Sequence, residues 1–143
     1  IATSYYQWSF DEKGEFGNVP EISKYVNDLP KDYDLYGSHE VAPLIALSTG
    51  RKLLGNYIDT NGQAFASGGQ DLKKASELAC EKGAYFLAKI TDALEYDVRD
   101  FGFDAYFDRE TFGSCCRRIK DFPDTSSKDP RNKIAVYECK NPE

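Results

Sequence analysis

The amino-acid sequence predicts a single α+β domain over residues 1–143, a mainly antiparallel sheet packed against two helices and held by two disulfides. Three observations support this fold class. Gly68 to Ile90 has the pattern of a helix that ends at a glycine and is followed by an apolar strand. Short runs rich in aromatic and β-branched residues recur along the chain. The four cysteines are even in number and have no C-x-x-C spacing, which favours disulfides over a metal site.

The N-terminal third predicts one strand and one helix. Residues 2–10 are rich in aromatic and β-branched types and indicate a strand, followed by a glycine-containing loop. Pro20 begins a short helix that Pro30 ends. Residues 31–39 are polar and indicate an extended loop. The apolar face of the helix consists of Ile22, Tyr25, Val26 and Leu29.

Two further segments precede the central stretch. Val41 to Leu47 is apolar but contains Pro43, so it fits either an edge strand or a helix that starts near the proline. Leu53 to Ile58 and Gln63 to Ala66 flank an Asn-Gly pair, which is typical of a hairpin turn.

The central helix and strand are the clearest prediction. Asp71 lies in the first turn, where a carboxylate suits the helix dipole, and Leu72, Ala75 and Ala79 recur at helical spacing. Gly83 suits a C-terminal cap, and Ala84 to Ile90 is an apolar run of strand length. The alternative is a helix that continues through Gly83 to Leu94, because a glycine inside a helix costs only about 1 kcal/mol.

The C-terminal third predicts two more strands. Residues 91–95 are polar enough for a turn, and the partial alternation of residues 96–107 indicates a strand. The cysteine pair lies in residues 112–119. Residues 121–133 hold two prolines and little apolar content, which predicts a long surface loop. Residues 134–139 form the final strand.

Cysteine arithmetic leaves two disulfide connectivities. A bond between the neighbours Cys115 and Cys116 would need a strained small ring. Cys80 and Cys139 therefore each pair with one of these two neighbours. Disulfides persist in oxidising compartments, so we expect a secreted, extracellular protein. The chain starts at Ile1 and contains no methionine, which is typical either of a mature chain or of a trimmed chain, with any signal peptide removed.

Net charge and hydropathy limit the classes of partner that the protein is expected to have. The net charge of −6 argues against nucleic acid. No apolar run approaches the roughly 20 residues that span a membrane. We therefore expect a protein or carbohydrate target.

The candidate catalytic residues are one histidine and a group of carboxylates. His39 lies beside Ser38, and a nucleophile-histidine-acid arrangement could include it. Asp108 and Glu110, with Asp104, alternate along or just beyond the strand predicted at 96–107, so they could share a face as glycoside hydrolysis requires. A single histidine argues against catalytic zinc, and no phosphate-binding loop occurs. We expect no metal and no cofactor.

The candidate binding residues are aromatic and basic. Tyr5, Tyr6 and Trp8 crowd the N-terminal strand, and an exposed face of it would suit a partner or a sugar. Arg117 and Arg118 form a basic cluster with Lys120 beside the cysteine pair, which could contact a phosphate or an acidic partner.

The order of elements from residue 35 onward resembles that of mono-ADP-ribosyltransferase toxins. Leu35-Tyr36-Gly37 stands where that family has a Tyr-Arg strand, and Phe65 to Gly69 stands where it has a Ser-Thr-Ser strand. Ala84 to Ile90 resembles the next strand, and Asp108-Arg109-Glu110 resembles the Glu-x-Glu loop. The family's arginine and its Ser-Thr-Ser triplet are absent. The resemblance implies the family's fold and a transferase site at Glu110.

Together these patterns predict a small secreted, disulfide-bonded protein that binds a target outside the producing cell without catalysis, in the manner of virulence effectors and toxins. The alternative is a secreted enzyme, either an ADP-ribosyltransferase or a hydrolase with an acid pair.

Overall fold

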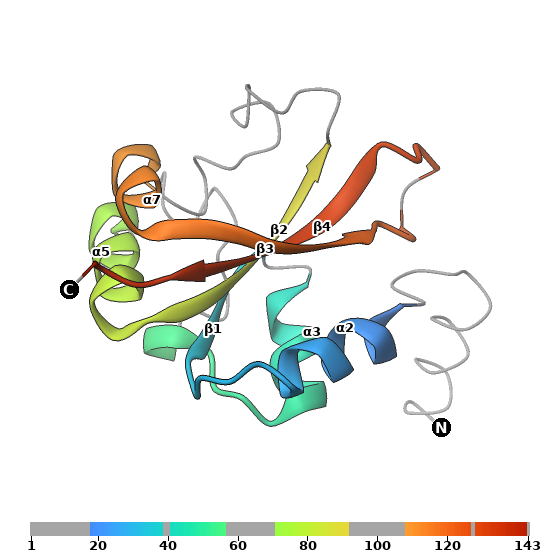
Figure 1. The fold of residues 1–143 in the computed structure, drawn as a ribbon, viewed down its shortest axis with the longest axis horizontal. Coiled ribbons are helices and arrows are strands. Elements are labelled where there is room, and N and C mark those ends of the chain that lie inside the picture. The colour runs from blue at the N-terminus through green and yellow to red at the C-terminus, as the bar shows by residue number, and fades with distance from the viewer. Residues whose placement is uncertain (1–17, 39–40, 57–70, 92–107, 127, 143) are drawn as a thin grey trace.

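The computed structural model describes residues 18–38, 41–56, 71–91, 108–126 and 128–142. Helices and strands are interspersed along the chain in these segments (Figure 1). In order, they are α2 (Val19–Asn27), β1 (Asp34–Gly37), α3 (Ala42–Thr49), the 3-10 helix η1 (Leu54–Asn56), α5 (Leu72–Lys82), β2 (Ala84–Thr91), α7 (Arg109–Cys115), β3 (Cys116–Pro123) and β4 (Asn132–Cys139). None of the helices in these segments is long and apolar enough to cross a membrane.

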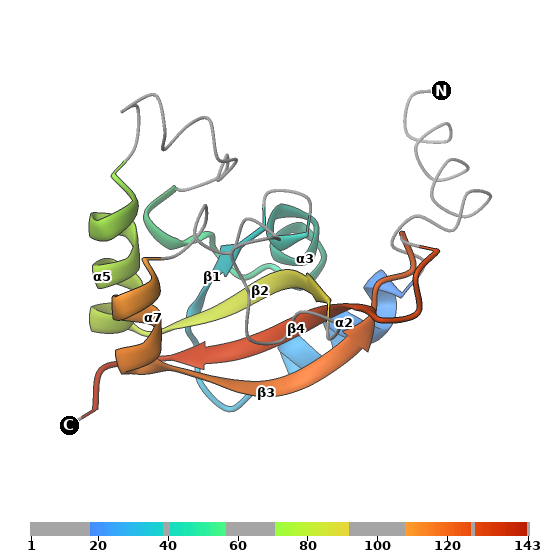
Figure 2. The same ribbon diagram turned by 90° about the horizontal axis from the view of Figure 1, so that it is seen from above.

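The strands form one four-stranded sheet in the order β1-β2-β4-β3 (Figure 2). β4 pairs antiparallel with both β2 and β3, whereas β1 pairs parallel with β2. The predicted α+β class and the two disulfides are confirmed. The sheet is mainly antiparallel, as predicted, and the β1–β2 pair is its one parallel pairing within the described segments.

Helices cover both faces of the sheet, which separates the apolar side chains into two cores. Tyr85 and Leu87 of β2 point toward α2 and α3, and Phe86 and Ala88 point toward α5 and α7. Figure 1 shows the two helix pairs lying apart, with α2 and α3 together beneath the sheet. Both faces of β2 carry apolar side chains, so both faces of the sheet must be covered by helices. The structure therefore has more helices packed on the sheet than the two that the sequence predicts.

Helix α2 follows the predicted pattern, and its flanks are held by side chains from elsewhere. Ile22 and Val26 are fully buried. Asn18 occupies the N-cap position, but its side chain makes no hydrogen bond to the helix. Its amide donates instead to the carbonyl oxygen of Pro123 at 2.8 Å, and its carbonyl accepts from the hydroxyl of Thr125. These bonds fix the start of α2 against the β3–β4 turn.

The segment between α2 and α5 resolves one alternative and corrects two predictions. Residues 42–49 form helix α3, which Gly50 ends in the left-handed conformation at φ 75°. The loop predicted at 31–39 contains β1, because Asp34 to Gly37 pair with β2. The first arm of the predicted hairpin is not a strand in its described part. Leu53 makes a single bridge to Leu35, and the chain then turns into η1.

The central stretch confirms the predicted helix, glycine stop and strand, and the continuous helix is wrong. Asp71 caps α5 by accepting a hydrogen bond from the backbone N–H of Lys74. Gly83 ends the helix with φ at 88°, and a Cβ there would lie 2.5 Å from the ring of Tyr33. The chain can therefore turn sharply into β2 only with glycine at this position.

The C-terminal region differs most from the prediction. Residues 109–115 form helix α7, and β3 extends to Pro123, so the surface loop predicted at 121–133 is shorter than expected. The final strand is confirmed and begins at Asn132. The strands predicted at 2–10 and 96–107 lie outside the described residues.

Candidate functional site

A hydrogen bond between the N-cap residue of α7 and a serine within α5 brings these two helices together. Asp108 is the N-cap of α7, and its backbone N–H donates to the hydroxyl of Ser76 on α5 at 2.8 Å. That hydroxyl in turn donates to the carbonyl oxygen of Leu72, one turn earlier. Ser76 is fully buried, so the start of α7 is fixed against α5 by a hydrogen bond shielded from water.

A pocket of about 280 Å³ opens between these two helices. Its lining is polar, and it contains both members of the predicted acid pair: Lys73, Asp108, Glu110, Thr111 and Ser114. Asp108 and Glu110 both line this pocket, and they lie at the start of a helix rather than along a strand. The correction follows from Asp108, whose side chain caps a helix instead of projecting from a sheet.

The carboxylate of Asp108 accepts hydrogen bonds from its own helix, α7. It accepts hydrogen bonds from the backbone N–H of Thr111 at 3.1 Å and from the Thr111 hydroxyl at 2.7 Å. These bonds from Thr111 lower the pKa of Asp108, because they stabilise the charged form. The group is therefore ionised near neutral pH, with its lone pairs partly engaged. Glu110 is exposed at the same pocket.

The sequence prediction did not include three residues of this lining. Lys73 comes from α5, and Thr111 and Ser114 come from α7. One signal was available, because Asp108 and Thr111 have the spacing of a helix N-cap and its third residue. The contribution of Lys73 depends on how α5 and α7 pack, which no local pattern contains.

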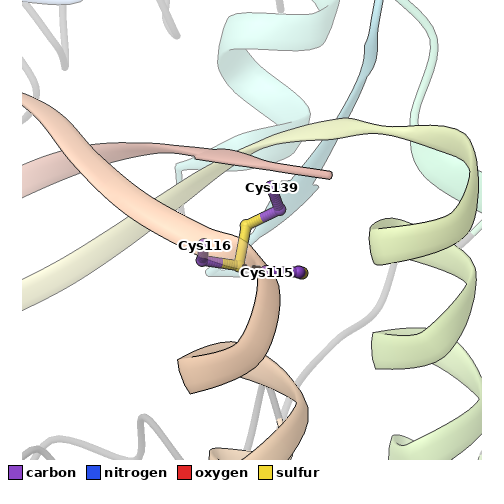
Figure 3. Close-up of side chains that lie close together, drawn as sticks. All are labelled: Cys115, Cys116 and Cys139. Atoms are coloured by element: carbon purple, nitrogen blue, oxygen red, sulfur yellow. Dashed lines mark hydrogen bonds between the residues drawn. A yellow bond between two sulfur atoms is a disulfide. The ribbon is translucent and has the colours of Figure 1, made fainter. Parts of the chain in front are cut away.

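The four cysteines lie together at the C-terminal end of α7. The disulfides are Cys80–Cys115 and Cys116–Cys139, which selects one of the two predicted connectivities. Cys115 is the last residue of α7 and Cys116 the first of β3, and their side chains bond to different partners. Figure 3 shows the bridge between Cys116 and Cys139, with Cys115 beside it. The Sγ atoms of Cys115 and Cys116 are 3.6 Å apart.

Backbone hydrogen bonds surround this group of sulfurs. The N–H of Lys140 donates to the carbonyl oxygen of Cys115, and the N–H of Asn141 donates to that of Cys80 at 2.7 Å. The residues that follow β4 therefore lie between the two disulfide-linked helices. The Sγ atoms of Cys115, Cys116 and Cys139 lie within 4.8 Å of one another. All are in disulfides, so a thiolate metal site would first need both bridges to be reduced.

The predicted basic cluster lies on β3 and is paired with acids and aromatic rings. Arg117 binds the carboxylate of Glu138 on β4 at 2.9 Å. Arg118 forms an ion pair with Asp121, and the ammonium of Lys120 lies 5.7 Å from the Phe122 ring centre. β3 is an edge strand of the sheet in the described segments, and charged residues on such a strand also discourage pairing with other chains.

His39, Tyr5, Tyr6 and Trp8 lie outside the described residues. Tyr36, from the segment that resembles the toxin family, is fully buried and packs 5.8 Å from the ring of Phe86. Its side chain belongs to the core.

Comparisons with protein-family models, with curated proteins and with solved structures give no significant match. The resemblance to mono-ADP-ribosyltransferase toxins therefore stays a prediction. The case for a function depends on this chain's own residues.

Proposed function

We propose that this protein is secreted and acts outside the producing cell by binding a protein or carbohydrate target, without catalysing a reaction. Small secreted effectors and toxins act in this way. The observation that carries the proposal is the pair of disulfides, Cys80–Cys115 and Cys116–Cys139. They join α5, α7, β3 and β4, and such bonds persist in oxidising compartments and are rare in the cytosol.

The pocket between α5 and α7 supports binding more than catalysis. Its volume of about 280 Å³ lies just below the roughly 300–1,000 Å³ of sites that enclose small molecules. Asp108 is engaged by Thr111, and its lowered pKa is opposite to what a general acid needs near neutral pH. Lys73 and Glu110 offer opposite charges at its rim, which suits a polar target surface.

A binding experiment tests this proposal. Labelled protein with both bridges intact is applied to glycan arrays and to intact cells. We expect saturable binding by the oxidised protein and none after reduction and alkylation. A Lys73→Ala, Glu110→Ala double variant should bind more weakly, whereas Lys24→Ala, an exposed change on α2, should bind normally. Absence of saturable binding by the oxidised protein would contradict the proposal.

The enzyme alternative has one observation in its favour, since Asp108 and Glu110 line the same pocket. NAD is added to the wild type and to Glu110→Gln, and the melting temperature and nicotinamide release are measured. Chromogenic oligosaccharides test the hydrolase version in the same way. Glu77→Gln, another exposed glutamate, is the matched control. Turnover lost in Glu110→Gln and kept in Glu77→Gln would favour the enzyme over the binding protein.

A further inference from the structure

The four sulfur atoms form a continuous row from α5 to β4. Cys80 is bonded to Cys115, Cys115 contacts Cys116 at 3.6 Å, and Cys116 is bonded to Cys139. The contact between the two bridges is near the van der Waals separation of two sulfurs. A thiolate released from either bridge therefore forms next to the other disulfide, without a large movement of the backbone.

The two bridges share a pattern of exposure. Cys80 and Cys139 are buried, at 2% and 0% exposure, whereas Cys115 and Cys116 are half-buried. An external thiol consequently meets Cys115 or Cys116 first. In thiol–disulfide exchange the attacked sulfur keeps the new bond and its partner leaves as a thiolate. Attack from solvent thus releases a buried sulfur inside the group.

We propose that these four cysteines are a thiol–disulfide exchange site that takes a small-molecule thiol and interconverts the two bridges. A thiolate RS⁻ attacks Sγ of Cys116, the RS–Cys116 bond forms, the Cys116–Cys139 bond breaks, and the electron pair leaves on Cys139. The Cys139 Sγ lies within 4.8 Å of that of Cys115. Its thiolate attacks Cys115, the Cys115–Cys139 bond forms, and Cys80 leaves.

The cycle closes without an oxidant or a reductant. The Cys80 thiolate attacks Cys116 in the mixed disulfide, forms Cys80–Cys116 and expels RS⁻. The external thiol is regenerated, and the number of disulfides is unchanged. The product is the second of the two connectivities that the sequence allows.

Exchange changes how α5 is held to α7. Cys80–Cys115 joins the two helices that form the pocket, with Lys73 on one side and Glu110 on the other. While Cys80 is free or is bonded to Cys116, α7 is released from this link, and the start of α7 is held by Asp108 and Ser76. The inference does not depend on the proposed binding function, because it follows from the sulfur positions.

Variants that leave one cysteine unpaired beside the remaining disulfide test the proposal. Cys80→Ser leaves Cys115 unpaired beside Cys116–Cys139, and Cys139→Ser leaves Cys116 unpaired beside Cys80–Cys115. Each variant is incubated at pH 8, with and without reduced glutathione, and its free thiol is then alkylated. Tryptic peptides 75–82, 110–117 and 134–140 separate Cys80, the adjacent pair and Cys139. Fragment ions distinguish Cys115 from Cys116.

We expect the label to spread to Cys116 in Cys80→Ser, as a Cys115–Cys139 bond forms, and to Cys115 in Cys139→Ser, as a Cys80–Cys116 bond forms. Glutathione should also give the wild type a fraction with Cys80–Cys116 and Cys115–Cys139. The double variant Cys116→Ser, Cys139→Ser has no second bridge and should keep Cys80–Cys115 unlabelled without glutathione. Label confined to Cys115 in the first variant and to Cys116 in the second would overturn the proposal. Because the two variants remove different bridges, failure of one to fold leaves the other decisive.

Discussion

The guanidinium of Arg51 lies 5.2 Å from the centre of the Tyr85 ring, where the end of α2 meets β2. The Arg51 side chain is only 10% exposed. The Tyr85 hydroxyl accepts a hydrogen bond from the backbone N–H of Lys31. The guanidinium donates to four backbone carbonyl oxygens, those of Val26, Leu29, Lys31 and Tyr33. Arg51 therefore stabilises the C-terminal end of α2 and the turn that leads to β1.

Replacing Arg51 should be costly even with another cation. A lysine has one compact ammonium and cannot bond all four carbonyls while stacking on Tyr85. We expect Arg51→Lys to lower the free energy of unfolding by about 2–4 kcal/mol, because several partly buried carbonyls lose a charged donor. Urea denaturation measures the change. Arg117→Lys, at an exposed ion pair, should lose less than about 1 kcal/mol; equal losses would show that Arg51 has no special role.

Three glycines form a matched series that separates steric from conformational cost. A Cβ at Gly37 would lie 2.0 Å from the carbonyl oxygen of Leu87, in the parallel β1–β2 pair. Gly37→Ala should therefore separate these strands and lower stability by more than about 3 kcal/mol. Gly50 has φ at 75° with nothing near its Cβ position, so Gly50→Ala should cost about 1–2 kcal/mol from backbone strain alone.

Gly113 is the third member of the series. It lies within α7, and a Cβ there would meet open space. Gly113→Ala should raise the free energy of unfolding by up to about 1 kcal/mol, since alanine favours a helix. Thermal or urea denaturation of the three variants gives the order. If Gly37→Ala were as mild as Gly50→Ala, the close approach of β1 to Leu87 would be wrong.

Asp108 should give the protein a measurable dependence on pH. Hydrogen bonds from Thr111 lower its pKa in the folded state. A carboxyl of this kind stabilises the fold above its unfolded pKa of about 3.9, and the contribution is lost as pH falls through the lower, folded pKa. At neutral pH, Asp108→Ala should lower the free energy of unfolding by about 1 kcal/mol through loss of the cap.

The difference between wild type and Asp108→Ala should shrink below about pH 4, as the wild-type carboxyl is protonated. Urea denaturation at neutral and at acidic pH measures it. Asp108→Asn keeps an acceptor for Thr111, so its loss should be smaller and should not vary with pH through this group. A difference for Asp108→Ala that stays constant down to pH 3 would contradict the role of the ionised cap.

The helices and strands that could be predicted are those that a short stretch of sequence specifies by itself. Helix α5 has a capping aspartate, a helical period and a terminal glycine within one short stretch, and β2 and β4 are continuous apolar runs. β3 gave no such signal, because Arg117, Arg118 and Lys120 are exposed. Its strand conformation comes from pairing with β4, a contact that edge-strand residues do not indicate by themselves.

The candidate site was predictable in part for the same reason. Asp108 and Glu110 are close in sequence, so their shared pocket could be expected, whereas Lys73 arrives through the packing of α5 on α7. The disulfide connectivity could not be chosen, since Cys115 and Cys116 are equally placed in sequence. The change from helix to strand between them selects it, because α7 directs Cys115 to α5 and β3 places Cys116 opposite Cys139.

The two disulfides should therefore contribute differently to structure. Cys116 and Cys139 are already direct partners in the β3–β4 ladder, whereas Cys80–Cys115 spans 35 residues and joins two helices. Loop-closure entropy assigns each bridge about 3–4 kcal/mol. We expect both double serine variants to lose stability on this scale, with distinct local effects.

Hydrogen exchange distinguishes these effects. Loss of Cys80–Cys115 should speed exchange of the amides in α7 and leave β4 protected, because the sheet keeps its ladder and α7 loses its covalent link. Loss of Cys116–Cys139 should leave α7 protected and expose only the ends of β3 and β4. Equal protection of α7 in the two variants would mean that Ser76 and Asp108 hold this helix without the disulfide.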